Sequence, residues 1–148
     1  MTDTVFVDTN VLVYVRDRTE AEKQERAAEW MAALWETHRG RLSWQVLQEY
    51  YVTVTGKLDS PRNPEAVRED IMALRAWKPT GTDFEAMDLA WTVQDRYGLS
   101  WWDALIVAAA LRSGSRWLLT EDLQAGQEIL GLTVVSPFQS APEDLLGR

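Results

Sequence analysis

The sequence contains no cysteine and only one histidine, His38, among its 148 residues. These absences exclude disulfide bonds, a cysteine nucleophile and a zinc site built from cysteine and histidine. A chain without cysteine suits the reducing conditions of the cytosol. We therefore expect a cytoplasmic protein whose chemistry depends on other side chains.

Long hydrophobic runs are also missing. The longest apolar stretch, 104–111, has eight residues, whereas a membrane-spanning helix needs about 20. The N-terminal stretch MTDTVFVDTN lacks the basic start of a secretory signal, and its apolar run ends at Asp8. The sequence thus predicts a soluble, unprocessed chain that makes no membrane contact.

Positive charge is scarce, because 15 Lys and Arg face 23 Asp and Glu and the net charge is −8. Such a chain repels nucleic acid as a whole and attracts a basic partner. Any contact with RNA must then be local. The pairs Arg16/Arg18 and Arg39/Arg41 could form a small positive rim, although ordinary surface charge is the simpler interpretation.

Apolar residues make up 46% of the chain, and eight of them are tryptophan. This composition excludes disorder, since so much apolar area can offset the entropy of ordering the chain. The length fits one domain. We expect residues 1–148 to form a single domain with a loose tail over about 140–148.

The hydrophobic pattern predicts strands alternating with helices. The strands are expected at 4–7, 116–120 and 132–137, and the helices at 19–38, 43–55, 64–77, 82–98 and 101–112, with a further short helix in 122–129. This order is typical of an α/β fold. We expect a three-layer α/β/α sandwich around a mainly parallel sheet.

Helix ends carry recognisable signals. Ser43 and Ser100 are expected to cap the helices that follow them, and Thr82 with Glu85 forms a capping-box pattern. Gly40 is a plausible C-terminal stop for the first long helix.

Three acidic residues occupy positions where parallel α/β folds bind ligands, beyond the carboxyl ends of strands. Asp8 follows the first strand, Asp122 follows the second, and Asp103 lies in the first turn of the helix between them. Each also has a purely structural interpretation. Asp8 suits a turn in DTN, Asp122 can cap a helix, and Asp103 fits a capping box with Ser100.

The helix after Asp103 weakens that structural interpretation. It carries no charge until Arg112 and is apolar on every side, which indicates burial. Desolvating a carboxylate costs several kcal/mol, whereas a cap and the helix dipole return only about 1–2 kcal/mol. A bound cation would offset the difference.

Carboxylates gathered at one sheet edge require a counter-ion, and no cysteine is present to favour a soft metal. Carboxylate oxygens suit Mg²⁺ or Mn²⁺. Such ions activate water and stabilise the leaving oxygen in phosphodiester hydrolysis, which is nuclease chemistry. Glu49 also carries a carboxylate, but its helix face points either to solvent or to a polar crevice, and periodicity leaves both open.

Four segments resemble one known family. VFVDTNVLVY, SWQVLQEYY, LSWWDALIVAAAL and WLLTEDLQAG, in this order, resemble the PIN domain, and at this length the VapC-type toxins of bacterial toxin–antitoxin pairs. The resemblance covers nearly the whole chain. It places the family's four acids on Asp8, Glu49, Asp103 and Asp122. It places the family's supporting polar residues on Asn10 and Thr120.

The resemblance implies a Mg²⁺- or Mn²⁺-dependent endoribonuclease that cleaves RNA, is usually a homodimer and is inhibited by a cognate antitoxin. An acidic crevice agrees with a basic antitoxin protein. The identity of the fourth acid is open, because Glu121 stands beside Asp122. The T-x-D spacing favours Asp122.

Two other functions compete with this hypothesis. One is an aspartate-based phosphatase that uses Asp8 as its nucleophile, but position 10 is Asn and every lysine precedes the late strands. The other is a catalytically silent PIN-like module that binds proteins, which the presence of all four acids disfavours.

Overall fold

The computed structural model describes residues 3–147, so positions 1, 2 and 148 of the predicted domain lie outside it. The strands are β1 (Val5–Val7), β2 (Gly40–Arg41), β3 (Trp117–Leu119), β4 (Glu128–Ile129) and β5 (Leu132–Val135). The helices are α1 (Thr9–Arg16), α2 (Ala21–Thr37), α3 (Trp44–Gly56), α4 (Pro64–Leu74), the short 3₁₀ helix η1 (Arg75–Trp77), α5 (Phe84–Tyr97), α6 (Trp101–Arg112) and α7 (Pro142–Leu146).

The strands form one sheet in the order β2-β1-β3-β5-β4. All neighbouring pairs are parallel except the β4–β5 pair, so the predicted mainly parallel sheet is confirmed. The register places Val7 opposite Leu119. The residues that follow β1 and β3 therefore emerge at the same edge of the sheet.

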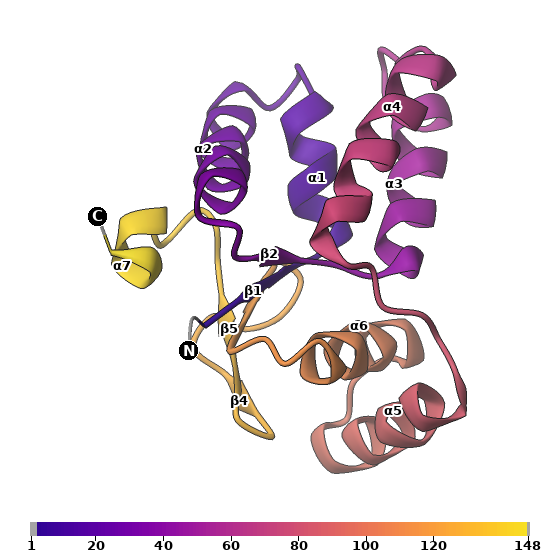
Figure 1. Ribbon diagram of the computed structural model, residues 1–148, viewed down its shortest axis with the longest axis vertical. Helices are drawn as coiled ribbons and strands as arrows, with labels where there is room; N and C mark the ends of the chain where they lie inside the picture. Colours follow the sequence, from indigo (N-terminus) through magenta and orange to yellow (C-terminus); the bar gives the residue numbers. More distant parts are fainter. Residues whose placement is uncertain (1–2, 148) are drawn as a thin grey trace.

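Helices cover both faces of this sheet. Helices α1 to α4 lie on one side and α5 and α6 on the other, which confirms the predicted three-layer sandwich (Figure 1). The residues of β1 are fully buried, and the apolar stretch Ala104–Ala110 of α6 is buried as well, as expected for a helix without a polar face. None of the described helices is long and apolar enough to cross a bilayer.

Two segments differ from the prediction. A turn at DTN was the structural alternative for Asp8, but Asp8 instead caps helix α1, an element that was not predicted. The short helix expected within 122–129 is absent, because this stretch forms turns and then β4, which pairs with β5. Gly126 has a φ of +87°, which a right-handed helix does not allow.

Helix ends agree with the prediction at Ser43 and Ser100, whose hydroxyls accept hydrogen bonds from backbone N–H groups three residues on. At α5, Asp83 rather than Thr82 is the cap and accepts from the Ala86 N–H at 3.0 Å. Gly40 does not end α2. Helix α2 ends at His38, which adopts the left-handed conformation.

The C-terminal segment also differs from the loose tail expected over about 140–148. Helix α7 forms there, and its Pro142 is buried. The Trp30 indole donates to the Ser140 carbonyl at 3.1 Å, and Arg39 donates to the Leu146 carbonyl at 3.2 Å. These contacts fix the segment against α2 and the residues that follow it.

Candidate active site

Asp8 lies at the centre of the candidate site. It follows β1, its N–H donates to the Leu119 carbonyl at 3.0 Å, and its carboxylate accepts from the Thr9 N–H at 2.7 Å. The side chain thus caps α1 and is held between two adjacent strands. Only 6% of the residue is exposed, so an ionisable group sits in the interior at the carboxyl edge of the sheet.

Asn10 and Thr120 join Asp8 to Asp122. The Asn10 amide donates to Asp8, Thr120 and Asp122 at 3.3, 3.0 and 3.1 Å, so its two protons are shared among three acceptors. The Thr120 hydroxyl donates to Asp8 at 2.8 Å and accepts from the Asp122 N–H at 3.0 Å. The structure therefore brings Asp8 and Asp122 into one hydrogen-bonded network.

Glu49 reaches this network from helix α3. Its side chain is exposed and accepts hydrogen bonds from the Thr9 hydroxyl and the Gln45 amide, both at 2.9 Å. Glu49 thus combines the two environments that the sequence left open, since it is exposed to solvent and has polar partners at the rim beside Asp8. Thr9 and Gln45 were not predicted, although Gln45 stands four residues before Glu49 on the same helix face, a spacing that signals contact.

Asp103 enters from the N-terminus of α6. Its N–H donates to the Ser100 hydroxyl at 3.2 Å, so Ser100 performs the capping. Within residues 3–147 the half-buried Asp103 carboxylate has neither a hydrogen-bond nor an ion-pair partner. It influences the site through its charge, because it raises the pKa of Asp122.

The environment of Asp8 disfavours a negative charge. Burial raises the pKa of the Asp8 carboxyl to about 7, and the hydrogen bonds from Thr120 and Thr9 only partly oppose this effect. The carboxylates of Asp122 and Glu49 contribute to the same increase. A nearby cation would favour the ionised form.

The same effects act on Asp122. Burial raises its pKa, the Asn10 amide lowers it, and the charges of Asp103, Glu121 and Glu49 raise it again. The carboxylates at this edge therefore repel one another, as the sequence analysis anticipated for acids gathered in one crevice.

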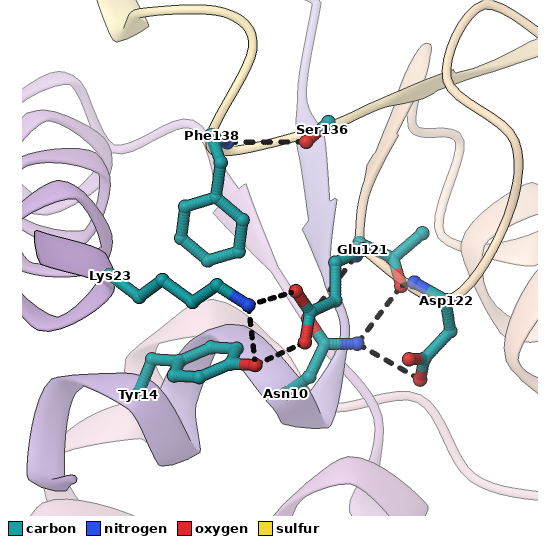
Figure 2. Close-up of polar contacts among 8 residues, drawn as sticks. Asn10, Tyr14, Lys23, Glu121, Asp122, Ser136 and Phe138 are labelled. Carbon is teal, nitrogen blue, oxygen red and sulfur yellow. Dashed lines mark hydrogen bonds and ion pairs between the residues drawn. The ribbon is translucent and has the colours of Figure 1, made fainter. Parts of the chain in front are cut away.

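Glu121 points to a different set of partners. It accepts a hydrogen bond from the Tyr14 hydroxyl and lies 3.1 Å from the ammonium group of Lys23. That ammonium group is also 5.0 Å from the Tyr14 ring centre and 5.2 Å from the Phe138 ring centre. Figure 2 shows Glu121 directed toward Lys23 and Asp122 directed away from it, beside Asn10.

The model of the family described as the PIN domain matches residues 5–126, which contain every residue of the candidate site described above except Phe138. The chain belongs to the PIN-domain family. No curated protein matched the sequence.

Solved structures share the PIN-domain fold. A toxin–antitoxin complex from Klebsiella pneumoniae aligns with a TM-score of 0.61 and 21% identity, over 90% of this chain and 98% of that chain. VapBC2 from Rickettsia felis, bound to a DNA fragment from its promoter, gives 0.59 and 14%, also over 90% and 98%. VapC20 from Mycobacterium tuberculosis, a toxin that cleaves the sarcin–ricin loop, gives 0.56 and 18%, over 78% and 87%.

The donor groups of this PIN domain fit a hard cation in their chemistry. They are carboxylate, hydroxyl and amide oxygens, which Mg²⁺ and Mn²⁺ prefer, and the buried Asp8 has no basic side chain among its hydrogen-bond partners. In the described chain, however, no three acidic or histidine side chains converge closely enough to hold one ion between them.

Proposed function

We propose that this PIN-domain protein is a metal-dependent endoribonuclease that hydrolyses RNA phosphodiester bonds. Its catalytic acids are Asp8, Glu49, Asp103 and Asp122. One observation carries the proposal. A buried carboxyl, Asp8, is hydrogen-bonded through Asn10 and Thr120 to a second acid at the same sheet edge, in surroundings that raise both pKa values. Such an arrangement opposes folding unless a cation or a proton compensates the charge.

The four acids would hold Mg²⁺ or Mn²⁺, and the bound ion would supply water activation and stabilisation of the leaving oxygen. The remaining roles belong to the chain itself. Asn10 and Thr120 fix the orientation of Asp8 and Asp122, since each donates to Asp8 and contacts Asp122. Glu49, held by the Thr9 hydroxyl, lies on the exposed side of the site.

The toxin of a toxin–antitoxin pair is the biological role that we propose. Toxin–antitoxin complexes are among the solved structures with this fold, which supports a protein partner of that kind. The net charge of −8 and the acidic edge favour a basic antitoxin. We further propose a homodimer that acts in the cytoplasm. Light scattering measures the mass of the protein alone, which tests the homodimer, and its mass with a co-expressed antitoxin, which tests the complex.

The test is RNA cleavage by the wild-type protein and by Asp8→Asn and Asp103→Asn. We expect the wild type to cut RNA with Mg²⁺ or Mn²⁺ and to lose activity in EDTA. Both variants should be strongly impaired. Asp88→Asn, the same change on the exposed surface of α5, should retain activity.

Two results would contradict the proposal. Equal cleavage by the wild type and the variants would point to a contaminating nuclease and remove the evidence for catalysis. Metal-dependent turnover of an aryl phosphate through an aspartyl-phosphate on Asp8 would show a phosphatase instead.

A further inference from the structure

A second feature adjoins the acidic site. Helices α3 and α6 begin on either side of a cavity of about 680 Å³, here termed the aromatic cavity. Its principal lining residues are Trp44, Gln45, Gln48, Glu49, Trp102 and Leu105. It therefore opens beside Glu49, one of the four proposed catalytic acids.

The two tryptophans of the aromatic cavity are exposed to solvent. Trp44 is 42% and Trp102 is 64% accessible to solvent. Across residues 3–147, neither indole pairs with another aromatic ring and neither indole N–H donates a hydrogen bond. Trp30, in contrast, is buried and donates to two carbonyls. Core packing therefore does not account for the Trp44 and Trp102 rings.

The polar groups of the aromatic cavity suit an uncharged ligand. Among residues 3–147, no lysine or arginine lines it, so no described cation there neutralises a phosphate. Gln45 and Gln48 supply amide donors and acceptors, the groups that pair with the edges of nucleobases. Flat indole faces stack on any base, because every base has a π-face. The chemistry of the cavity thus matches a base rather than a backbone phosphate.

A neighbouring cavity completes a path for the RNA backbone. It has a volume of about 380 Å³, shares Gln48 and Glu49 with the aromatic cavity, and is lined by Thr9 and Lys57. Lys57 forms no ion pair within the described part of the chain. A strand whose base enters the aromatic cavity can therefore pass Glu49 and place a phosphate near Lys57.

We propose that the aromatic cavity holds one unpaired base of single-stranded RNA, stacked on Trp102, the more exposed of the two indoles, next to the bond that is cut. This proposal rests on the proposed nuclease function and names its substrate as single-stranded RNA. Stacking also explains how a chain of net charge −8 binds RNA, since base contacts need no positive field. Duplex RNA keeps its bases stacked and paired, and so cannot fill the cavity.

Binding is measured by fluorescence anisotropy in an Asp8→Asn background, which prevents cleavage. The probes are a labelled single-stranded RNA of about ten nucleotides and the same RNA with an abasic position. We expect Trp102→Leu to weaken binding by roughly tenfold or more, and Trp102→Phe to restore most of the loss. Trp91→Leu removes another exposed indole, 44% accessible, outside the cavity and serves as the control.

Salt dependence separates the two kinds of contact. The loss caused by Trp102→Leu should be the same at all salt concentrations, because stacking releases no counterions. Lys57→Met should instead reduce the salt dependence, by about 0.7 in the logarithmic slope for one lost contact to a single strand. An abasic substitution at the stacked position should cost little in the Trp102→Leu protein, because both changes remove the same interaction.

Several outcomes overturn the proposal. The first is equal RNA affinity of Trp102→Leu and the Trp91→Leu control. The second is a Trp102→Leu protein that loses its dimer mass but keeps its RNA affinity. The third is a Trp102→Leu protein that binds an arginine-rich peptide more weakly but binds RNA as before. Cleavage by the wild type with no effect of Trp102→Leu overturns the base site and leaves the nuclease function intact. RNA binding that depends on Trp102, without any cleavage, supports the base site and overturns the nuclease function.

Discussion

The ammonium nitrogen of Lys23 lies 3.1 Å from a carboxylate oxygen of Glu121, although 98 residues separate the two in the sequence. This ion pair, together with the hydrogen bond from Tyr14, directs Glu121 away from the site (Figure 2). The adjacent Asp122 instead accepts from Asn10. Two neighbouring acids therefore have different surroundings.

We expect the different surroundings of Glu121 and Asp122 to give their variants different RNA cleavage activities. Asp122→Asn removes a proposed metal ligand and should lower kcat/KM for RNA by roughly 100-fold or more, since even outer-shell changes cost 10–100-fold at metal sites. Glu121→Gln keeps the shape of a side chain that faces Lys23, and its activity should stay close to that of the wild type. If Glu121→Gln were the more damaging change, Glu121 would be the fourth acid.

The stability of the metal-free protein should depend on pH through Asp8. Burial raises the pKa of Asp8 to about 7 in the folded protein, well above the ordinary value of an aspartate, so the folded state binds the proton more tightly. Stability should then fall as the pH rises from about 4 to about 7, and the penalty is complete above that range. Asp8→Asn keeps a capping side chain but carries no charge.

Urea unfolding in EDTA measures this effect. The free energy of unfolding of Asp8→Asn, relative to that of the wild type, should increase by a few kcal/mol between about pH 5 and about pH 8. Asp88→Asn, which neutralises an exposed acid on α5, should show no such gain. A constant difference between Asp8→Asn and the wild type across this range would contradict the assigned burial effect.

The main features of the site followed from strand-end geometry. Residues after adjacent parallel strands must emerge together, and Asp8 and Asp122 do so because β1 pairs with β3. The buried helix α6 likewise followed from its lack of charge. Glu49 required the resemblance to a known family, because helix periodicity alone left its face undecided.

Other features depend on contacts that local sequence does not encode. Helix α1 has only eight residues, and its start, DTN, is as typical of a turn as of a cap. The helix-like composition of 122–129 is overridden by pairing of β4 with β5. The orientation of Glu121 depends on Lys23, a partner on a distant helix.

Metal binding should raise the melting temperature. The acids repel one another in the free protein, and an ion that binds only the native state stabilises it by about 2.7 kcal/mol at 100 times its Kd. Saturating Mn²⁺ should therefore shift the melting temperature of the wild type upward. Asp103→Asn should reduce the shift, whereas Asp88→Asn should leave it unchanged. No shift in the wild type would count against the proposed metal site.

Close packing at Gly40 yields a final prediction that concerns the fold alone. A Cβ built on Gly40 would lie 2.5 Å from the ring of Trp77, which is 3% exposed and packs on Trp35 with ring centres 5.1 Å apart. Because the ring is held on both sides, Gly40→Ala must displace it and should destabilise the protein by about 1–3 kcal/mol. Gly56→Ala, at the end of α3 with open space around its Cβ, should be neutral or stabilising. Urea midpoints that are equal for the two variants would mean that the Trp77 ring moves freely, and the tight contact at β2 would then not contribute to stability.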